Sequence, residues 1–328
     1  MKQLFAAACA VACVTAAPAY AWEPTKPIEI VVPFGPGGAS DQMARTLQGL
    51  IQKHSLSPQP VIVVNKPAAA GGEAMMDIQK SARDPHKLLT TSSGIYMTPL
   101  STKMPVNWRD FTPVAMLAQD EFLIWAQGSA PYKTLTEFIE AAKTASPPFK
   151  IGGAGSKRED DLITFALGAE TGVKFAYIPY KSGGETSTQL AGGHIQASTG
   201  NPSEEIGSFK GGTAKPLCLL SEKRMRYTTK VANDMSWSDV PTCGEQGVKF
   251  TYNMLRGIFM PGRVTPEQQA FYVDMFKKAV ETPEWKDYLE RSGLLPDFRD
   301  GKPFEEFLTA DEAKHKELMG KAGFLPTN

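Results

Sequence analysis

The chain has 328 residues, and its 35 Lys and Arg are balanced by 35 Asp and Glu, so its formal net charge at pH 7 is zero. A balanced charge gives no broad electrostatic attraction to nucleic acid or to an anionic membrane surface. The length allows one large domain or two modest ones.

The first 21 residues have the layout of a secretory signal peptide. Lys2 gives a positive start, residues 4–14 form a short apolar run, and an Ala-Tyr-Ala cleavage site ends at Ala21. The apolar run is shorter than the roughly 20 residues that a membrane-spanning helix needs. We therefore expect export, cleavage after Ala21, and a soluble mature protein.

The cysteines fit an exported protein. Cys9 and Cys13 would leave with the signal peptide, so the mature chain would keep Cys218 and Cys243. Two cysteines in an oxidising compartment are most simply a disulfide, which we expect here, and two buried free thiols are the alternative. Closing a loop of about 25 residues would stabilise the fold by roughly 3 kcal/mol on the chain-entropy model.

Strand-like and helix-like segments alternate in the first half of the mature chain. Residues 28–33 predict a strand, and Ser40 can cap the helix that follows, because its apolar positions repeat at helical spacing. Those positions are Met43, Leu47, Leu50 and Ile51. Further strands are predicted over 61–65, 87–94, 113–118 and 122–127.

The second half repeats the opening design. Thr134 and Glu137 form a capping box ahead of a helix. Residues 149–172 then read as a short strand, a glycine-rich turn and a helix, for which Ser156 and Glu159 would form another capping box. Strands over 175–180 and 194–199 flank a short helix. Thr-Pro pairs at 265–266 and 282–283 predict the starts of two C-terminal helices, and a third amphipathic stretch follows near 304–308.

This alternation predicts an α/β fold with largely parallel sheets. In such sheets ligands bind beyond the carboxyl ends of the strands, where the loops meet helix N-termini. Two of these loops are rich in glycine, at residues 35–38 and 152–155. A helix N-terminus presents unpaired N–H groups, and glycine lets an anion approach them closely.

Motifs for nucleotides and for catalysis are absent. Neither loop completes G-x-G-x-x-G or carries the Gly-Lys pair of a P-loop, and G-x-S-x-G does not occur. The four histidines lack metal-ligand spacing. The acids at 159–161 read as first-turn residues that the helix dipole favours. We therefore expect no cofactor, no metal and no catalysis. Both loops are either simple turns or a pair of anion sites that a small dianion bridges.

The segment PFGPGGASDQMAR, residues 33–45, resembles the signature P-F-x-x-G-G-x-x-D-x-x-A-R of the Bug (TctC-like) family. Similar segments follow in the family's order: VNKPAAAGG, RDPHKLLTTSSG, the long stretch from GAGSKREDD to GGHIQAST, DVPTCGEQGV and RGIFMPGRVTPE. The resemblance covers nearly all of the mature chain. Members of this family are periplasmic receptors of tripartite tricarboxylate transporters.

The resemblance implies a two-lobed periplasmic binding protein of type II, with two crossing strands between the lobes. Domain 1 would comprise residues 22–119 plus 253–328, and domain 2 residues 120–252. The ligand would lie in the cleft between them. The implied ligand-binding residues are Phe34, Gly37, Gly38, Ala39, Ser40, Asp41, Ser92, Ser93, Gly155, Ser156, Lys157, Tyr180, Lys181, Gly183 and Asn201.

The resemblance also implies a function. The protein would capture a small di- or tricarboxylate such as citrate, as a monomer, and deliver it to the membrane components of the transporter. Ser156-Lys157 is similar to the Ser-Lys of citrate-receptor-like members, so Lys157 is expected to hold a second carboxylate; a solvent-exposed lysine is the alternative. An aromatic dicarboxylate such as a phthalate, stacked on Phe34, Tyr96 or Tyr180, is a second ligand class. An exported hydrolase is the rival from another class.

Overall fold

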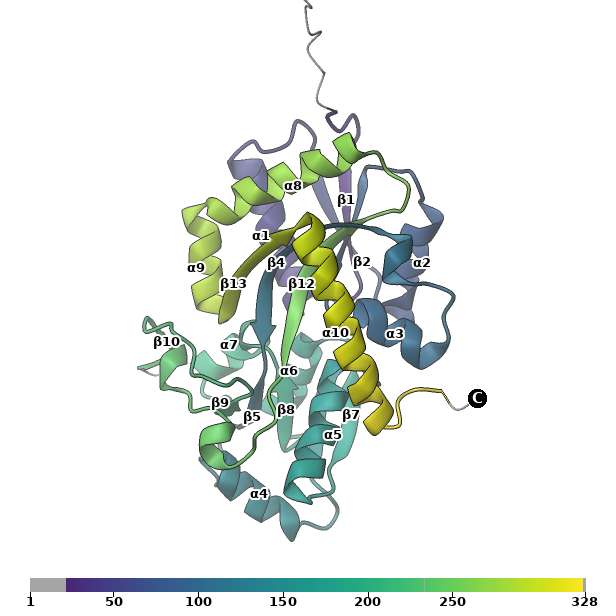
Figure 1. Cartoon of the computed structure of the whole chain (residues 1–328). Helices are drawn as coiled ribbons and strands as arrows, with labels where there is room; N and C mark the ends of the chain where they lie inside the picture. Colours follow the sequence, from purple (N-terminus) through teal and green to yellow (C-terminus); the bar gives the residue numbers. More distant parts are fainter. Residues whose placement is uncertain (1–21, 233, 327–328) are drawn as a thin grey trace, which may run out of the picture.

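The computed structural model describes residues 22–232 and 234–326, and the expected signal peptide lies outside them. These residues form two lobes, one above the other in Figure 1, each built on one large β-sheet with helices packed against it. We call the six-stranded sheet and its helices lobe 1, and the five-stranded sheet and its helices lobe 2. The two-lobed α/β fold is thus as the sequence predicted.

Lobe 1 has a mixed sheet. Its strands, in spatial order, are β13 (Leu294–Asp300), β4 (Thr112–Glu121), β12 (Asn253–Met260), β3 (Lys87–Thr91), β1 (Ile28–Val32) and β2 (Val61–Asn65). β1 runs parallel to β2 and β3, whereas β12 is antiparallel to β3 and β4, and β13 is antiparallel to β4. Its helices are α1 (Ala39–Lys53), α2 (Gly72–Lys80), α3 (Gly94–Thr102), α8 (Pro266–Glu281), α9 (Pro283–Ser292) and α10 (Gly301–Lys321).

Lobe 2 repeats this plan. Its strands, in spatial order, are β7 (Ala176–Tyr180), β6 (Lys150–Ala154), β8 (Ala197–Gly200), β5 (Leu123–Gln127) and β9 (Ala214–Leu219). β6 runs parallel to β7 and β8, and β5 is antiparallel to β8 and β9. Its helices are α4 (Leu135–Lys143), α5 (Glu159–Thr171), α6 (Gly183–Ala191) and α7 (Pro202–Lys210). A small ribbon of β10 (Lys230–Ala232) and β11 (Met235–Ser236) lies beside this sheet.

Two segments cross between the lobes. The chain leaves the first sheet after β4, passes Phe122, and enters the second sheet at β5; it returns through Tyr252 into β12. The Phe122 and Tyr252 rings meet edge to face with centroids 5.5 Å apart. The predicted domain boundaries at 119/120 and 252/253 lie beside these positions and stay a prediction.

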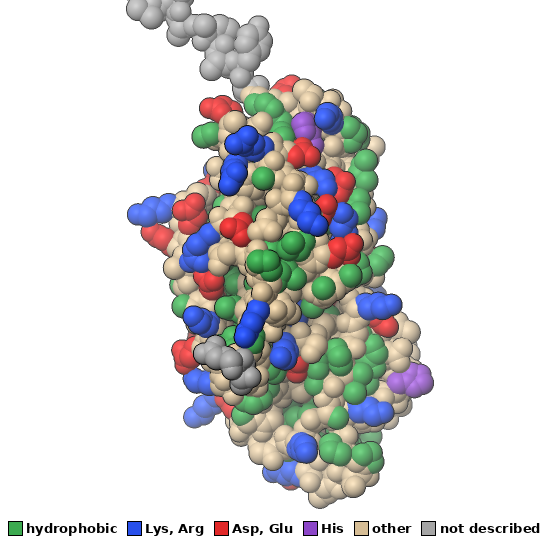
Figure 2. All heavy atoms as spheres, turned by 90° about the vertical axis from the view of Figure 1, so that its right-hand side faces the viewer, with side chains coloured by type: hydrophobic (Ala, Val, Ile, Leu, Met, Phe, Trp, Pro, Cys, Tyr) green, Lys and Arg blue, Asp and Glu red, His purple; other side chains and the backbone are tan. Residues whose placement is uncertain are grey.

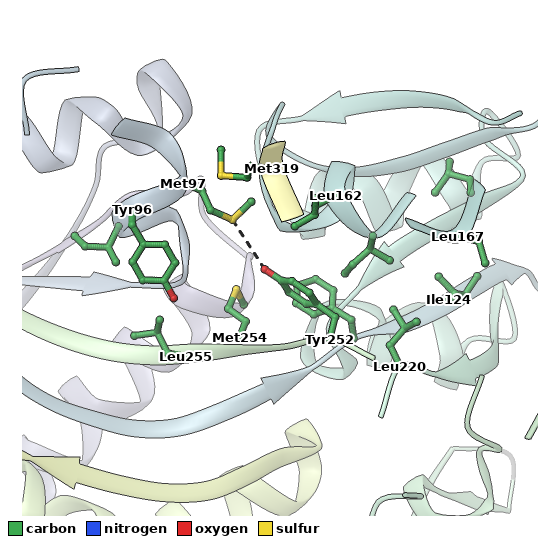
Figure 3. Packing of buried hydrophobic residues seen from close by; sticks show 14 of the residues in the cluster. Tyr96, Met97, Ile124, Leu162, Leu167, Leu220, Tyr252, Met254, Leu255 and Met319 are labelled. Atoms are coloured by element: carbon green, nitrogen blue, oxygen red, sulfur yellow. Dashed lines mark hydrogen bonds between the residues drawn. The ribbon is translucent and has the colours of Figure 1, made fainter. Parts of the chain in front are cut away.

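One apolar cluster runs through the crossing and joins the two lobes. It includes Tyr96 and Met97 of lobe 1, Tyr252 and Met254 at the crossing, and Leu162 of lobe 2, and Figure 3 shows Tyr252 between the two groups. Each of these side chains is at most 4% exposed. Burial of this kind stabilises by about 25 cal/mol per Å² of apolar surface, so the crossing is a packed element as well as a connection.

The C-terminal helix reaches from one lobe to the other. α10 follows β13 of lobe 1 and runs diagonally down to the neighbourhood of α5 in Figure 1. Past its end, the ring of Phe324 lies 6.4 Å from that of Phe165 on α5. The sequence predicted this amphipathic helix from Phe304 and Leu308, which are both fully buried.

The capping predictions have mixed outcomes. Thr134 caps α4 and Thr265 and Thr282 cap α8 and α9, as predicted. The prediction for Ser40 is wrong, because α1 already begins at Ala39 with Gly38 as N-cap. The prediction for Ser156 is also wrong: α5 begins at Glu159, and Arg158 is its N-cap residue.

Two further expectations concern stability and surface. Cys218 and Cys243 form the expected disulfide, with Cα atoms 4.9 Å apart, and it joins β9 to the turn that follows Thr242. On the face in Figure 2, acidic and basic side chains are interspersed, in keeping with the balanced composition. Among the helices of the described residues, none has both the length and the apolar character needed to cross a bilayer.

Candidate ligand-binding cleft

The first glycine loop presents the start of α1 to lobe 2. Gly37 has φ +81°, a left-handed conformation that favours glycine. Asp41, 3% exposed, braces this loop: its carboxylate accepts from the Gly37 N–H at 3.0 Å and from Asn65 Nδ2 at 2.9 Å, and it pairs with Arg45. Burial raises the pKa of Asp41, but these hydrogen bonds outweigh it and hold the pKa below its usual value. Asp41 therefore shapes the loop, and its predicted role in ligand binding stays a prediction.

A carboxylate from lobe 2 lies at this helix start. The Ala39 N–H donates to Glu204 Oε1 at 3.0 Å, and the Asn201 N–H donates to Glu204 Oε2 at 3.3 Å. Glu204 belongs to the first turn of α7. Gly183, another predicted site residue, lies directly against it: a Cβ at Gly183 would come within 2.0 Å of the Glu204 carboxyl carbon. The predicted residues Gly38, Ala39, Gly183 and Asn201 thus surround one carboxylate.

Arg158 fills the middle of the cleft. Its side chain, on lobe 2, donates through Nη1 to the Ala70 carbonyl at 2.7 Å and through Nη2 to Ser92 Oγ at 2.9 Å, both on lobe 1. Its guanidinium carbon lies 4.5 Å from the centroid of the Phe34 ring, a cation–π arrangement. Arg158 is only 1% exposed. It therefore joins lobe 2 to the predicted residues Phe34 and Ser92 of lobe 1.

A second lobe-2 carboxylate reaches the start of α3. The Gly94 N–H donates to Glu159 Oε1 at 2.9 Å, while Arg158 Nε donates to Glu159 Oε2 at 3.2 Å. Burial raises the pKa of Glu159, but the Arg158 charge and the hydrogen bonds outweigh it and lower the pKa below the usual value. Glu159 is therefore ionised at neutral pH. Ser93, the N-cap residue of α3, is fully buried beside it.

Arg256 closes the back of the cleft at the crossing strands. It pairs with Asp120, donates through Nη1 to Ser40 Oγ at 2.8 Å, and donates through Nη2 to Asn201 Oδ1 at 3.0 Å. Both charged side chains are at most 3% exposed. Burial raises the pKa of Asp120 to about 6 in spite of Arg256. This pair ties Ser40 of lobe 1 to Asn201 of lobe 2.

The second glycine loop uses its N–H groups locally. Gly155 N–H donates to the Tyr180 carbonyl at 2.8 Å, and Lys157 N–H donates to Asp161 Oδ2 at 2.8 Å. The side chains of Ser156, Lys157 and Lys181 are exposed. Gly155, Ser156, Tyr180 and Lys181 line a cavity of about 410 Å³ at the mouth of the cleft, together with Phe34 and Arg158. Of these two basic neighbours, Arg158 lies inside the cleft and Lys157 faces solvent.

Sequence reasoning missed the charged residues of the cleft: Arg158, Glu159, Glu204, Asp120 and Arg256. Asn201 and Glu204 have the spacing of a capping box, which hides any further role of the acid. Arg256 stands inside an apolar strand run, Asp120 lies in a short polar stretch between two apolar runs, and buried charges need partners. That pairing signal was available in the sequence. Among the described residues, no group of three or more His, Cys, Asp or Glu is placed to hold a metal ion.

Two α/β lobes, two crossing segments and helix starts that meet across a cleft are the architecture of a periplasmic solute-binding protein. Residues 43–324 match the family described as the tripartite tricarboxylate transporter family receptor, TctC. The chain belongs to this family, as the sequence resemblance indicated. The family consists of solute-binding receptors and not of enzymes, which removes the hydrolase alternative.

Similar sequences of individual proteins support this family assignment. A UPF0065 protein from the gbd 5' region of Cupriavidus necator is 29% identical over 303 residues, which cover 92% of this chain and 88% of that protein. Protein BugT of Bordetella pertussis is 30% identical over 230 residues, which cover 68% of this chain and 67% of BugT.

Two solved structures share the fold. An R. palustris protein solved with adipate has a TM-score of 0.84 at 22% identity, over 93% of this chain and 99% of that one. MatC from Rhodopseudomonas palustris, with bound malate, has a TM-score of 0.78 at 20% identity, over 90% of this chain and 99% of that one.

Proposed function

We propose that this receptor works in the periplasm, after export and signal-peptide cleavage, as a monomer. It captures a small di- or tricarboxylate of the citrate type between its lobes. The lobes close over the ligand, and the closed form presents it to the membrane components of a tripartite tricarboxylate transporter. The protein performs no chemistry on the ligand.

The observation that carries the proposal is the pair of helix starts in lobe 1. The N–H groups of Ala39 and Gly94 each donate to a carboxylate oxygen, at 3.0 and 2.9 Å. Charge-assisted hydrogen bonds at helix N-termini are among the stronger polar contacts in proteins, because the helix dipole adds to them. Two such sites on one lobe suit a ligand that carries two carboxylates.

Arg158 takes the role of the cationic partner in this proposal. Its guanidinium lies beside the start of α3 and over the Phe34 ring, and it is withdrawn from water, where a charge pair is stronger than at the surface. Lys157 faces solvent, so we assign the second carboxylate to Arg158 instead. Ser92 supplies a hydroxyl beside it, and Asn201 supplies an amide beside Arg256.

The neighbours with adipate and malate support a carboxylate as the ligand class. An aromatic dicarboxylate is the second candidate, because Phe34 and Tyr180 line the same cavity at the cleft mouth. Tyr96 gives that candidate no support, since it is 2% exposed and belongs to the core.

A thermal-shift screen of the purified mature protein at fixed pH tests the proposal. The panel holds mono-, di-, tri- and aromatic dicarboxylates, with neutral sugars as the control. Ligand that binds only the native state at 100 times its Kd stabilises by about 2.7 kcal/mol and raises Tm. We expect the largest rise with an aliphatic di- or tricarboxylate. A rise with phthalates alone would select the aromatic class, and no rise with any acid would overturn the proposal.

A further inference from the structure

The carboxylates that lie on the lobe-1 helix starts belong to the protein itself. Glu204 and Glu159 are on lobe 2, and each accepts from an N–H group of lobe 1, at Ala39 and Gly94. Under the function proposed above, these N–H groups are the positions that a ligand's carboxylates take. The chain therefore places an internal copy of the ligand's acidic groups in its own cleft.

The space for these side chains is built into the lobes. A Cβ at Gly183 would lie 2.0 Å from the Glu204 carboxyl carbon, and a Cβ at Gly94 would lie 1.8 Å from Arg158 Nη2. Neither glycine has a positive φ, so the backbone conformation alone does not require glycine at either position. At each position the space that a Cβ would need is taken by a charged side chain, Glu204 at Gly183 and Arg158 at Gly94.

Further polar contacts complete the closed arrangement. Arg158 bonds Ala70 and Ser92 across the lobes, and Gln42 Nε2 donates to the Ser203 carbonyl at 3.0 Å. The remaining enclosed space between Phe34, Ser40, Asp160, Glu204 and Arg256 is about 20 Å³, which is room for about one water molecule. A dicarboxylate therefore reaches the Ala39 and Gly94 N–H groups, which lie inward of the 410 Å³ cavity at the cleft mouth, only after Glu204 and Glu159 have moved away.

We propose that Glu204 and Glu159 act as internal competitors of the ligand, closing the cleft by themselves. An external carboxylate then binds by displacing them from the Ala39 and Gly94 N–H groups. Because only the displaced form accepts the ligand, the measured affinity is the intrinsic affinity reduced by the fraction of that form. Glu204 and Glu159 thereby set the lowest ligand concentration to which the receptor responds.

Small-angle X-ray scattering of the free protein tests the closure. The mature protein is unfolded in guanidinium with its disulfide intact, dialysed to remove any co-purified acid, and refolded in a carboxylate-free buffer. We expect the wild type to give the compact profile calculated from this structure. Glu204→Ala and Gly94→Ala should both raise the radius of gyration. Gly94→Ala changes no charge and leaves each isolated lobe unstrained, because its clash is with Arg158 of the other lobe.

Glu205→Gln is the matched control. Glu205 is the next residue of α7, but its carboxylate accepts from Ser187 and Ser198, both within lobe 2. It should leave the profile compact. Circular dichroism checks that each variant is folded. An open wild type, or a Glu204→Ala protein as compact as wild type, would overturn the internal competition whatever the ligand is, so this result is separate from failure of the ligand screen.

Calorimetry with the acid that gives the largest thermal shift supplies a second measurement. We expect Glu204→Ala to bind it roughly tenfold more tightly than wild type, with Glu204→Gln in between, since the amide still accepts from Ala39 but without charge. Weaker binding by Glu204→Ala would contradict the proposal, and would mean that Glu204 contacts the ligand instead.

Discussion

The helix starts of lobe 1 and of lobe 2 face each other but carry opposite groups. In lobe 1, α3 has no acid in its first turn, and the acid of α1, Asp41, is turned back onto its own glycine loop. In lobe 2, the first turns of α5 and α7 are rich in acids, and Glu159 and Glu204 among them reach across to lobe 1. One lobe therefore offers N–H groups and the other offers carboxylates.

The difference shows what a glycine-rich turn does and does not imply. Both loops have a strand, glycines and a helix in the same order, and the sequence treats them alike. In the second loop, however, the N–H groups of Gly155 and Lys157 already have partners within lobe 2. A glycine turn becomes an anion site only where its N–H groups have no local acceptor. In the first loop Asp41 likewise accepts from the Gly37 N–H, but the Ala39 N–H has its acceptor, Glu204, in the other lobe.

Removing Arg256 should have the largest effect on stability. This residue holds Ser40 at the start of α1 and Asn201 at the start of α7. Arg256→Ala leaves Asp120 buried without its partner, and breaking a buried pair costs about 3–5 kcal/mol. Urea denaturation followed by tryptophan fluorescence measures the loss. Arg256→Met with Asp120→Leu removes both charges and should recover most of it. A loss below about 1 kcal/mol in the single variant would refute this role for the pair.

Gly38→Asp should place an acidic side chain at the start of α1, as α5 and α7 of lobe 2 already have. The new carboxylate takes the N-cap position of α1 and accepts from the N–H groups meant for a ligand. We expect at least a hundredfold loss of carboxylate affinity, about 2.7 kcal/mol, by calorimetry. Gly49→Asp, an exposed position in the same helix, is the control for charge alone. Normal affinity in Gly38→Asp would remove the first loop from the site.

Much of the architecture could be predicted from periodicity and capping. Met43, Leu47, Leu50 and Ile51 repeat at helical spacing, and all of them are buried in α1. The parallel order was only partly foreseen: β12 and β13 run antiparallel to β4, since the chain returns from lobe 2 into the first sheet. Sequence alone gives no signal for a return of that kind, because strand direction depends on contacts far apart in the chain.

The charges of the cleft were harder to predict. Glu159 and Glu204 are in first turns, where an acid is already explained by the dipole and by capping. Their contacts with Gly94 and Ala39 span 65 and 165 residues. Choosing between Lys157 and Arg158 required the start of α5, which lies at Glu159, two residues later than a Ser156 cap predicts. A local rule that explains a residue thus conceals its long-range role.

The buried acid Glu205 of lobe 2 should make the free energy of unfolding depend on pH. Burial raises its pKa to about 7, above the ordinary 4.5, so the folded protein binds this proton more tightly than the unfolded chain does. Its contribution is therefore intact below about pH 4.5, and stability falls as pH rises towards 7. Asp120 and Glu121 act in the same direction. Glu205→Gln should be more stable than wild type by about 3 kcal/mol at pH 8 and equal to it at pH 4.5. Urea denaturation across this range measures the difference, and parallel pH profiles would contradict it.

The adjacent residues Arg158 and Lys157, at the start of α5, allow a test of which basic side chain binds the ligand. Arg158 is buried between the lobes, whereas Lys157 is exposed and its backbone N–H is already bonded to Asp161. Arg158→Ala should weaken a dicarboxylate at least tenfold, about 1.4 kcal/mol, and Lys157→Ala less than twofold. Arg158→Lys should fall between them, because an ammonium keeps the charge but not the planar fork that reaches Ala70 and Ser92 together. Calorimetry with one dicarboxylate compares all three. If Lys157→Ala caused the larger loss, the second loop would hold the ligand from its exposed side, and the assignment of Arg158 would be wrong.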